Sequence, residues 1–263
     1  MPSEPIKIEF GQASHVGSVR ALNEDTLLTL TLGLGISPTG ISFGLYAIAD
    51  GVGGHEGGEI ASGLALRVMA ESIVKSILLV ESEGRLSELN DELILKDLTQ
   101  AVATANSEVY VQSQVKGNNM GTTLVATLFI GNTVYIANVG DSRVYFLEGE
   151  ELRQITNDHS LVAALVAAGE ITPDEIYIHP RRNVITRCLG IRQCVEVDLF
   201  TEELKPGDAL LLCSDGLWEM VRDNEIRDVV VRAQSSQAAC EHLVELANQN
   251  GGIDNISVII VKV

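Results

Sequence analysis

The chain has few basic residues and no long apolar run. Lysine and arginine total 18 against 36 aspartates and glutamates, which gives a net charge of −18. A surface with this much negative charge repels phosphate backbones and anionic lipid. Nucleic acids and membranes are therefore poor candidate partners. No apolar run approaches the roughly 20 residues that span a bilayer, and the N-terminus lacks a basic segment followed by an apolar one. We therefore expect a cytoplasmic protein.

The cysteine motifs of metal-binding and disulfide-rich proteins are also absent. The four cysteines are irregularly spaced and form no C-x-x-C pair, so neither a zinc site nor a disulfide framework is expected. The single tryptophan, Trp218, is expected in the core or at its rim, behind Asp215.

The apolar pattern predicts one α+β domain over residues 1–263. With 46% apolar residues, the chain can bury a substantial core. Helical periodicity and strand-like runs occur in separate blocks, which favours an α+β fold over a doubly wound parallel sheet. Helices are predicted over 58–80, 93–115, 223–233 and 237–248, with shorter ones in 160–178. Strands are predicted over 6–10, 26–31, 42–49, 195–200, 209–213 and 256–263, with hairpins in 121–156.

The stretch "ADGVGGHEGGE", residues 49–59, follows a strand-like apolar run and is rich in glycine. It does not fit a dinucleotide fingerprint, because the third glycine is replaced by Glu56. A phosphate-binding P-loop also fails, since Gly58 is followed by glutamate, and H-E-x-x-H lacks its second histidine. What remains is Asp50 at a strand end before a flexible turn, which suits a hard divalent cation. A turn simply capped by Asp50 is the alternative.

Further acidic residues border other apolar strands. Any one of them is explained by the preference of aspartate for turns, but the whole set is explained poorly in that way. Carboxylates gathered at one sheet edge would instead suit a site that holds more than one metal ion. The residues concerned are Glu24, Asp25, Asp141, Asp215 and Asp254.

Eight motifs together resemble a known family. They are "RALNED", "ADGVGGHEGGEIAS", "MGTTLVA", "NVGDSRVY", "NDHS", "TRCLG", "LLLCSDGLWE" and "GGIDNISVIIV". Their order and spacing are similar to those of the type-2C metal-dependent protein serine/threonine phosphatases, the PPM family, in its compact bacterial form. The resemblance covers residues 17–261. It implies a four-layer αββα sandwich, with two central antiparallel sheets flanked by helices and a flap subdomain at about 160–182.

The resemblance also implies a two-metal centre that is loaded with Mg²⁺ or Mn²⁺. Asp50 would bridge the two ions and the carbonyl of Gly51 would bind one of them. Asp215 and Asp254 would bind the other ion, and Glu24 would act through a bound water. In such enzymes a metal-bridging water attacks the phosphorus of phosphoserine or phosphothreonine directly, so no protein nucleophile is needed.

Three further assignments follow from the same resemblance. Asp141, together with Asp215, would form a third and weaker metal site, and Arg20 would hold the substrate phosphate. His55 would either protonate the leaving alkoxide or only order its loop. Alternatives to a protein phosphatase are a non-catalytic phosphoprotein-binding module and a small-molecule phosphomonoesterase.

The predicted flap is the candidate determinant of substrate choice. Ser160 is expected as a helix N-cap within it. Near the end of this region, Arg181, Arg182 and Arg187 form a basic cluster that could meet a phosphorylated partner protein. Pairing with the surplus carboxylates of the chain is the alternative. We expect a monomer.

Overall fold

The structure is a computed structural model, which describes residues 8–34, 41–52, 57–85 and 88–263. Its strands form two sheets in which all the registered pairings are antiparallel. The first sheet has the order β1 (Glu9–His15), β11 (Ile256–Lys262), β10 (Ala209–Cys213), β7 (Arg143–Glu148) and β8 (Glu151–Gln154). The second has the order β2 (Asp25–Leu34), β3 (Ile41–Val52), β5 (Leu124–Ile130), β6 (Thr133–Val139) and β9 (Asp198–Glu203), with β4 (Gly121–Thr122) paired to the end of β3.

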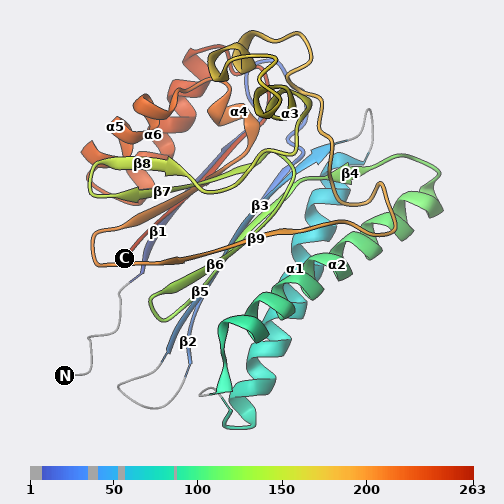
Figure 1. Cartoon of the computed structure of the whole chain (residues 1–263), viewed down its shortest axis with the longest axis vertical. Helices are drawn as coiled ribbons and strands as arrows, with labels where there is room; N and C mark the ends of the chain where they lie inside the picture. The colour runs from blue at the N-terminus through green and yellow to red at the C-terminus, as the bar shows by residue number, and fades with distance from the viewer. Residues whose placement is uncertain (1–7, 35–40, 53–56, 86–87) are drawn as a thin grey trace.

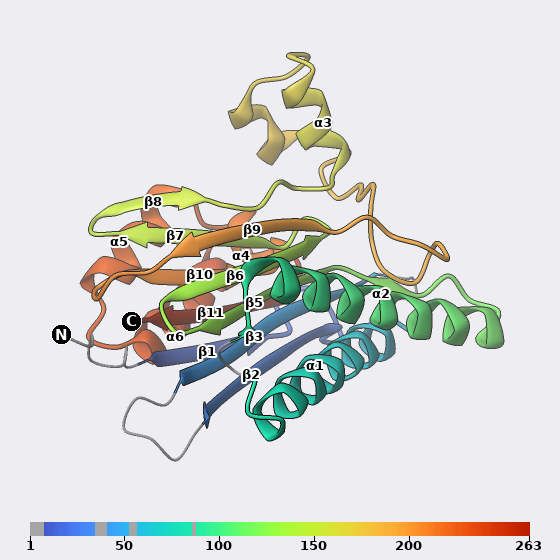
Figure 2. The same ribbon diagram turned by 60° about the horizontal axis from the view of Figure 1, so that its bottom comes forward.

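Helices cover the outer face of each sheet (Figure 1). The second sheet carries α1 (Gly58–Ser82) and α2 (Asp91–Lys116). The first sheet carries α4 (Asp215–Trp218), α5 (Asp223–Arg232) and α6 (Ser236–Gln249). The remaining helices, α3 (Leu161–Ala167) and the 3₁₀ helix η2 (Pro173–Ile178), project from one side of the sandwich (Figure 2). The four-layer α+β prediction is confirmed.

The alternation of β3 shows why the sandwich has three apolar layers. Leu45, Ala47 and Ala49 point into the core beneath α1 and α2. Tyr46 and Ile48 point the other way, into the core between the two sheets. Successive side chains of a strand face opposite sides, so a strand that is buried on both faces is apolar at nearly every position. That is the pattern of the run "FGLYAIA".

The predicted helices agree with the structure to within a few residues, and α2 shows how capping residues mark such ends. The side chain of Asn90 accepts a hydrogen bond from Leu93 N (3.0 Å) at the start of α2, and Gly117 ends that helix at φ +66°. None of the helices in the described ranges is both long and apolar enough to cross a bilayer.

The first strand differs from its prediction at 6–10. β1 extends to His15 through the polar stretch "GQASH", which has no apolar alternation. Backbone pairing with the apolar strand β11 holds β1 in place, and Gly11 faces the start of α6. A Cβ at Gly11 would collide with the backbone of Gln237. Tertiary pairing therefore sets this strand, and local propensity does not.

Candidate active site

The antiparallel register brings the ends of several strands to one edge of the sandwich. Asp50, near the end of β3, pairs directly with Asp25 at the start of β2. In the other sheet, the end of β10 pairs with the start of β7 and with the start of β11. Asp141, Asp215 and Asp254 lie in or directly beside the connections at these ends. Acidic residues that are far apart in the sequence thus meet at a single edge.

The backbone of Asp50 is held firmly by the neighbouring strand. Its N–H donates to Thr123 Oγ1 (3.0 Å), and its carbonyl oxygen accepts from Thr123 N and from Thr122 Oγ1 (both 2.8 Å). Burial raises the pKa of the Asp50 carboxyl well above its usual value, and the nearby Asp25 and other acidic groups raise it further. The carboxylate therefore lies among like charges in a partly dry environment.

The glycines after Asp50 allow three segments to approach closely. A Cβ at Gly51 would collide with the backbone of Gly58, and a Cβ at Gly58 would collide with the carboxylate of Glu24. Gly51 N also donates to the carbonyl oxygen of Glu24 (3.2 Å). Burial, followed by the charge of Glu59, raises the pKa of Glu24. The glycine-rich turn thus brings Glu24 next to the Gly51 backbone.

Asp141 and Asp215 are buried acids with unsatisfied oxygens. Their exposed fractions are 1% and 8%, and Oδ1 of each has no hydrogen-bond partner. Burial is the main cause that raises the pKa of Asp141 to about 7 and that of Asp215 well above its usual value. The buried Trp218 donates its indole N–H to the Asp141 carbonyl oxygen (3.0 Å). As expected, Trp218 lies in the core behind this edge.

Arg20 forms an ion pair at the same edge. Its Nη2 lies 2.6 Å from Asp254 Oδ2, and its side chain keeps 48% of its surface exposed. The hydrogen bond to Asp254 is the main cause that raises the pKa of Arg20, so the guanidinium stays charged. It can bind a solvent-side anion while it orients Asp254.

Asp25 was grouped with the strand-border acids in the sequence but received no role. In the structure its Oδ2 accepts from Ser214 Oγ (2.8 Å), while its Oδ1 is buried without a partner. Burial is the main cause that raises its pKa to about 6. The only local sequence signal is its position next to Glu24, because its contacts with Asp50 and Ser214 depend on the pairing of distant strands.

The donor set fits hard divalent cations. Carboxylate oxygens of Asp25, Asp141 and Asp215 are buried without partners, and such groups are costly unless a cation or proton compensates them. Among the described residues, no group of three or more acidic, histidine or cysteine side chains could by itself hold an ion. Mg²⁺ needs no such group, since it is usually bound by one or two carboxylates and keeps several waters. His55 lies outside the described residues.

The flap region contacts α4 and the turn between α4 and α5. Ser160 caps α3 as predicted, because its hydroxyl oxygen accepts from Ala163 N (3.2 Å). The ring of Tyr177 lies between Trp218, with ring centroids 6.3 Å apart, and the Arg222 guanidinium, 3.3 Å from the Tyr177 centroid. Arg182 Nε donates to Glu219 Oε2 (3.0 Å).

Two members of the predicted basic cluster are already paired. Arg182 binds Glu219, and Arg187 Nη1 lies 2.6 Å from Asp198 Oδ1. Pairing with the chain's own carboxylates, the alternative considered for these arginines, therefore holds for both. Neither presents a free charge to a phosphorylated partner.

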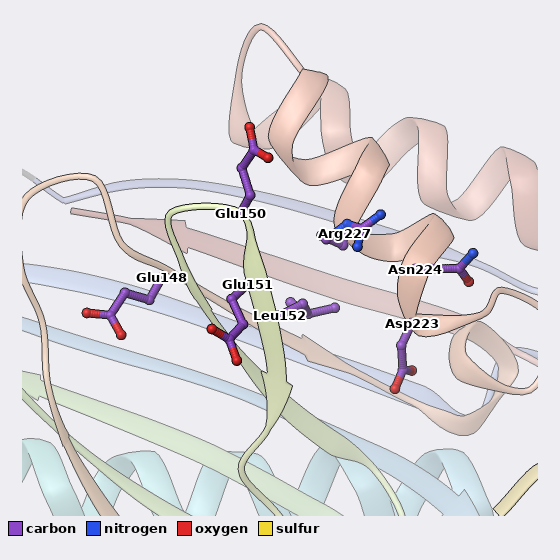
Figure 3. A pocket seen from close by; sticks show the side chains of 7 residues that line it. All are labelled: Glu148, Glu150, Glu151, Leu152, Asp223, Asn224 and Arg227. Carbon is purple, nitrogen blue, oxygen red and sulfur yellow. The ribbon is translucent and has the colours of Figure 1, made fainter.

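A separate acidic hollow lies away from the edge that carries Asp50. It has a volume of about 630 Å³ and lies between the β7–β8 hairpin and the start of α5 (Figure 3). The carboxylates of Glu148, Glu150 and Asp223 point in different directions there. Because they do not converge on a common point, this hollow does not resemble a metal site.

The chain belongs to the protein phosphatase 2C family, whose family model matches residues 33–250. A serine/threonine phosphatase, stp, of Listeria welshimeri is 38% identical over 225 residues, which cover 83% of this chain and 84% of that protein. Protein phosphatase PhpP of Streptococcus pneumoniae is 37% identical over 219 residues, which cover 83% of this chain and 85% of that protein.

Solved structures of relatives share the whole fold. The serine/threonine phosphatase PstP of Mycobacterium tuberculosis is 36% identical, has a TM-score of 0.81 and covers 97% of this chain and 98% of that one. The catalytic domain of PstP in complex with two manganese ions is 35% identical, with a TM-score of 0.78 and 97% coverage of both chains. The chain spans 45% of the full-length PstP sequence.

Proposed function

We propose that this protein is a Mg²⁺- or Mn²⁺-dependent phosphatase that hydrolyses phosphoserine and phosphothreonine in other proteins. One observation carries the proposal: buried, mutually repelling carboxylates with unpartnered oxygens meet at one sheet edge in a chain of the protein phosphatase 2C family. The relatives named as serine/threonine phosphatases, and the PstP structure with two manganese ions, support the same reaction and the same type of metal.

We assign the metal ligands as the sequence predicts. Asp50, the Gly51 carbonyl, Asp215 and Asp254 would hold two ions, and Glu24 would act through a water. A bound divalent cation lowers the pKa of a coordinated water and neutralises charge on phosphoryl oxygens. Asp141 would contribute to a third ion, and its unpartnered Oδ1 supports that role.

The chain's own residues position the substrate and the ligands. Arg20 would bind the substrate phosphate with the guanidinium donors that its bond to Asp254 leaves free. Asp25 would fix the orientation of Asp50 and Ser214, because it lies directly across the strand pair from the first and bonds to the second. Protonation of the leaving alkoxide by His55 stays a prediction.

We further propose that the chain acts as a single domain over residues 1–263, with the flap at about 160–182, and as a monomer. The apolar core between the two sheets contains residues from both of them, and each sheet shares a further core with the helices that cover it. This arrangement supports one domain. The net charge of −18 supports a protein substrate over nucleic acid. Light scattering coupled to size-exclusion chromatography would test the monomer.

The deciding experiment measures phosphate release from a phosphothreonine peptide and from p-nitrophenyl phosphate with Mn²⁺, with Mg²⁺ and with EDTA. We expect release that depends on the metal and that disappears in Asp215→Ala, while circular dichroism shows that the variant stays folded. A much higher kcat/KM for the peptide would favour a protein phosphatase over a small-molecule phosphomonoesterase. Metal-independent release, or full activity in Asp215→Ala, would contradict the assignment.

A further inference from the structure

A second hollow lies along the segment that follows the flap. Its volume is about 670 Å³, within the size range of ligand pockets, and nine residues between 185 and 196 line it, directly after the flap. The lining combines apolar side chains such as Ile191 and Val195 with the two arginines Arg187 and Arg192. This mixture of apolar wall and a few polar groups is typical of binding sites.

Backbone hydrogen bonds connect Leu189, which lies between the lining residues Cys188 and Ile191, to a residue that contacts Asp50. Leu189 N donates to Thr122 O (2.8 Å), and Thr122 N donates to Leu189 O (3.2 Å). The hydroxyl of the same Thr122 donates to the carbonyl oxygen of Asp50 (2.8 Å). Leu189 is therefore connected to Asp50 through a single intervening residue, Thr122.

The other end of the segment is tied to the loop that carries Asp141. Thr186 N donates to the carbonyl oxygen of His159 (2.8 Å), and His159 Nδ1 accepts from Gly140 N (3.0 Å). Gly140 directly precedes Asp141. Thr186 and Leu189 of this segment are thus hydrogen-bonded to residues that contact or precede Asp50 and Asp141, while the carbonyl oxygens of Arg192 and Gln193 accept from Asn106 Nδ2 on α2 (both 3.1 Å).

The two arginines of the lining differ in their charge balance. Arg187 is neutralised by Asp198 (2.6 Å) and Glu196 (3.3 Å). Arg192 is exposed, and its side chain makes no ion pair or hydrogen bond in the part of the chain that the structure describes. In a chain with twice as many acidic as basic residues, Arg192 is left with five N–H donors for an anion from outside.

We propose that this hollow is a docking subsite for the polypeptide beside the phosphorylated residue, and that Arg192 selects an anionic side chain there. The inference rests on the proposed function, which supplies a phosphoprotein substrate. The anion can be the carboxylate of an aspartate or glutamate, or a second phosphate. The apolar wall accommodates the neighbouring side chains of the same peptide.

The test compares phosphothreonine peptides that differ only in their flanking residues. The flanks are alanine, glutamate, lysine or a non-hydrolysable phosphonate analogue of phosphoserine. For the wild type we expect a kcat/KM about three- to tenfold higher with glutamate flanks than with alanine flanks, as for a partly exposed charge pair. A larger preference for the phosphonate would identify the second phosphate as the better ligand. The net negative charge of the protein repels acidic peptides, so a preference for glutamate or phosphonate flanks would have to come from a local basic group.

Two variants locate the preference. Arg192→Gln should bring the glutamate-to-alanine ratio of kcat/KM to about one, and Arg192→Glu should favour lysine flanks instead. Ratios cancel any change at the metal centre, because all the peptides share it. Arg232→Gln is the matched control, since Arg232 is 80% exposed on α5, and it should keep the wild-type ratio. A ratio near one in the wild type, or one that survives in Arg192→Gln, would overturn the proposal.

Fluorescence anisotropy of labelled peptides separates the subsite from the chemistry. The same three- to tenfold preference should appear in Kd, and it should weaken as salt screens the charge pair. A protein that shows this preference in Kd but releases no phosphate would contradict the proposed function and support the subsite. Equal Kd values for the alanine and glutamate peptides, with normal turnover, would contradict the subsite and support the proposed function.

Discussion

Two groups of carboxylates in this protein have opposite environments. At the edge that carries Asp50, acids are buried, raise one another's pKa and leave oxygens without partners. Around the hollow of Figure 3, Glu148 is exposed and pairs with Lys205 (2.8 Å), which is the main cause that lowers its pKa. Asp223, beside the same hollow, accepts from the Tyr145 hydroxyl (3.0 Å).

The comparison shows that acidic composition alone does not identify a site. Exposed carboxylates that already have partners gain little from a metal ion. Buried carboxylates that repel one another are unfavourable until a cation or a proton compensates their charge. The first group is therefore destabilising in the metal-free protein, and the free energy of metal binding offsets that cost.

The largest expected effect is on catalysis when a charge is removed from the buried group. Asp215→Asn keeps the shape of the side chain but removes a metal-binding carboxylate. We expect metal-dependent kcat to fall by at least about 10³-fold, as is common for central catalytic groups. Calorimetric titration should show weaker Mn²⁺ binding, while the metal-free variant should melt at a higher temperature because one like charge is gone. A metal-free variant that melts below the wild type would contradict this account of repulsion.

The next effect is a pH dependence of the metal-free protein. Asp25, with a pKa of about 6, and Asp141, with a pKa of about 7, bind protons more readily in the folded chain than in the unfolded chain. Between about pH 4 and 7 the folded state thus holds more protons, so its stability falls as pH rises, by up to about 1.4 kcal/mol per unit for each carboxyl.

Denaturant unfolding in EDTA across this pH range measures the slope. Asp141→Asn should remove the part of the fall that belongs to Asp141, between its unfolded pKa and about 7. Saturating Mn²⁺ should reduce the fall in the wild type, since the cation replaces the protons. An identical slope for the wild type and Asp141→Asn would show that Asp141 is ionised in the folded metal-free chain.

A smaller effect is expected at the residue that links the edge to the core. Trp218→Phe retains an aromatic ring for the guanidinium of Arg143, which lies 3.7 Å from the tryptophan ring, but loses the N–H donated to Asp141. Loss of one buried hydrogen bond should cost about 1–2 kcal/mol and lower Tm by roughly 2–6 °C. Mn²⁺ affinity should also decrease, because the Asp141 loop loses a contact. An unchanged Tm would mean that the loop is held by other contacts.

The sequence predicts the layers and much of the edge for identifiable reasons. Helix ends carry capping residues such as Asn90, and strands buried on both faces are continuously apolar. Asp50, Asp141, Asp215 and Asp254 lie at or beside the ends of such strands, so their positions there are encoded locally. The prediction of the α+β fold rests on the same local signals together with the joint order of eight motifs, and the two observed sheets confirm it.

What could not be predicted depends on pairing between distant segments. The position of Asp25 across from Asp50 needs the β2–β3 register, and its bond to Ser214 needs the two sheets to meet. That the Arg192 side chain forms no ion pair among the described residues, while Arg187 pairs with Asp198, likewise becomes known only from the folded structure. For Arg181, Arg182 and Arg187 the sequence leaves two possibilities open, a phosphorylated partner or the surplus carboxylates of the chain, and it singles out nothing at Arg192.

The smallest expected effect is at the exposed group of acids. Glu148→Gln removes one charge next to the hollow of Figure 3 and breaks its exposed pair with Lys205. Because such pairs contribute little in water, Tm should stay within about 1–2 °C of the wild type, and kcat/KM in Mn²⁺ should be unchanged. Asp215→Asn removes the same formal charge, so the pair of variants compares one lost carboxylate in two environments. A large loss of Mn²⁺-dependent activity in Glu148→Gln would mean that net acidity, and not burial at the strand ends, sets metal binding in this protein.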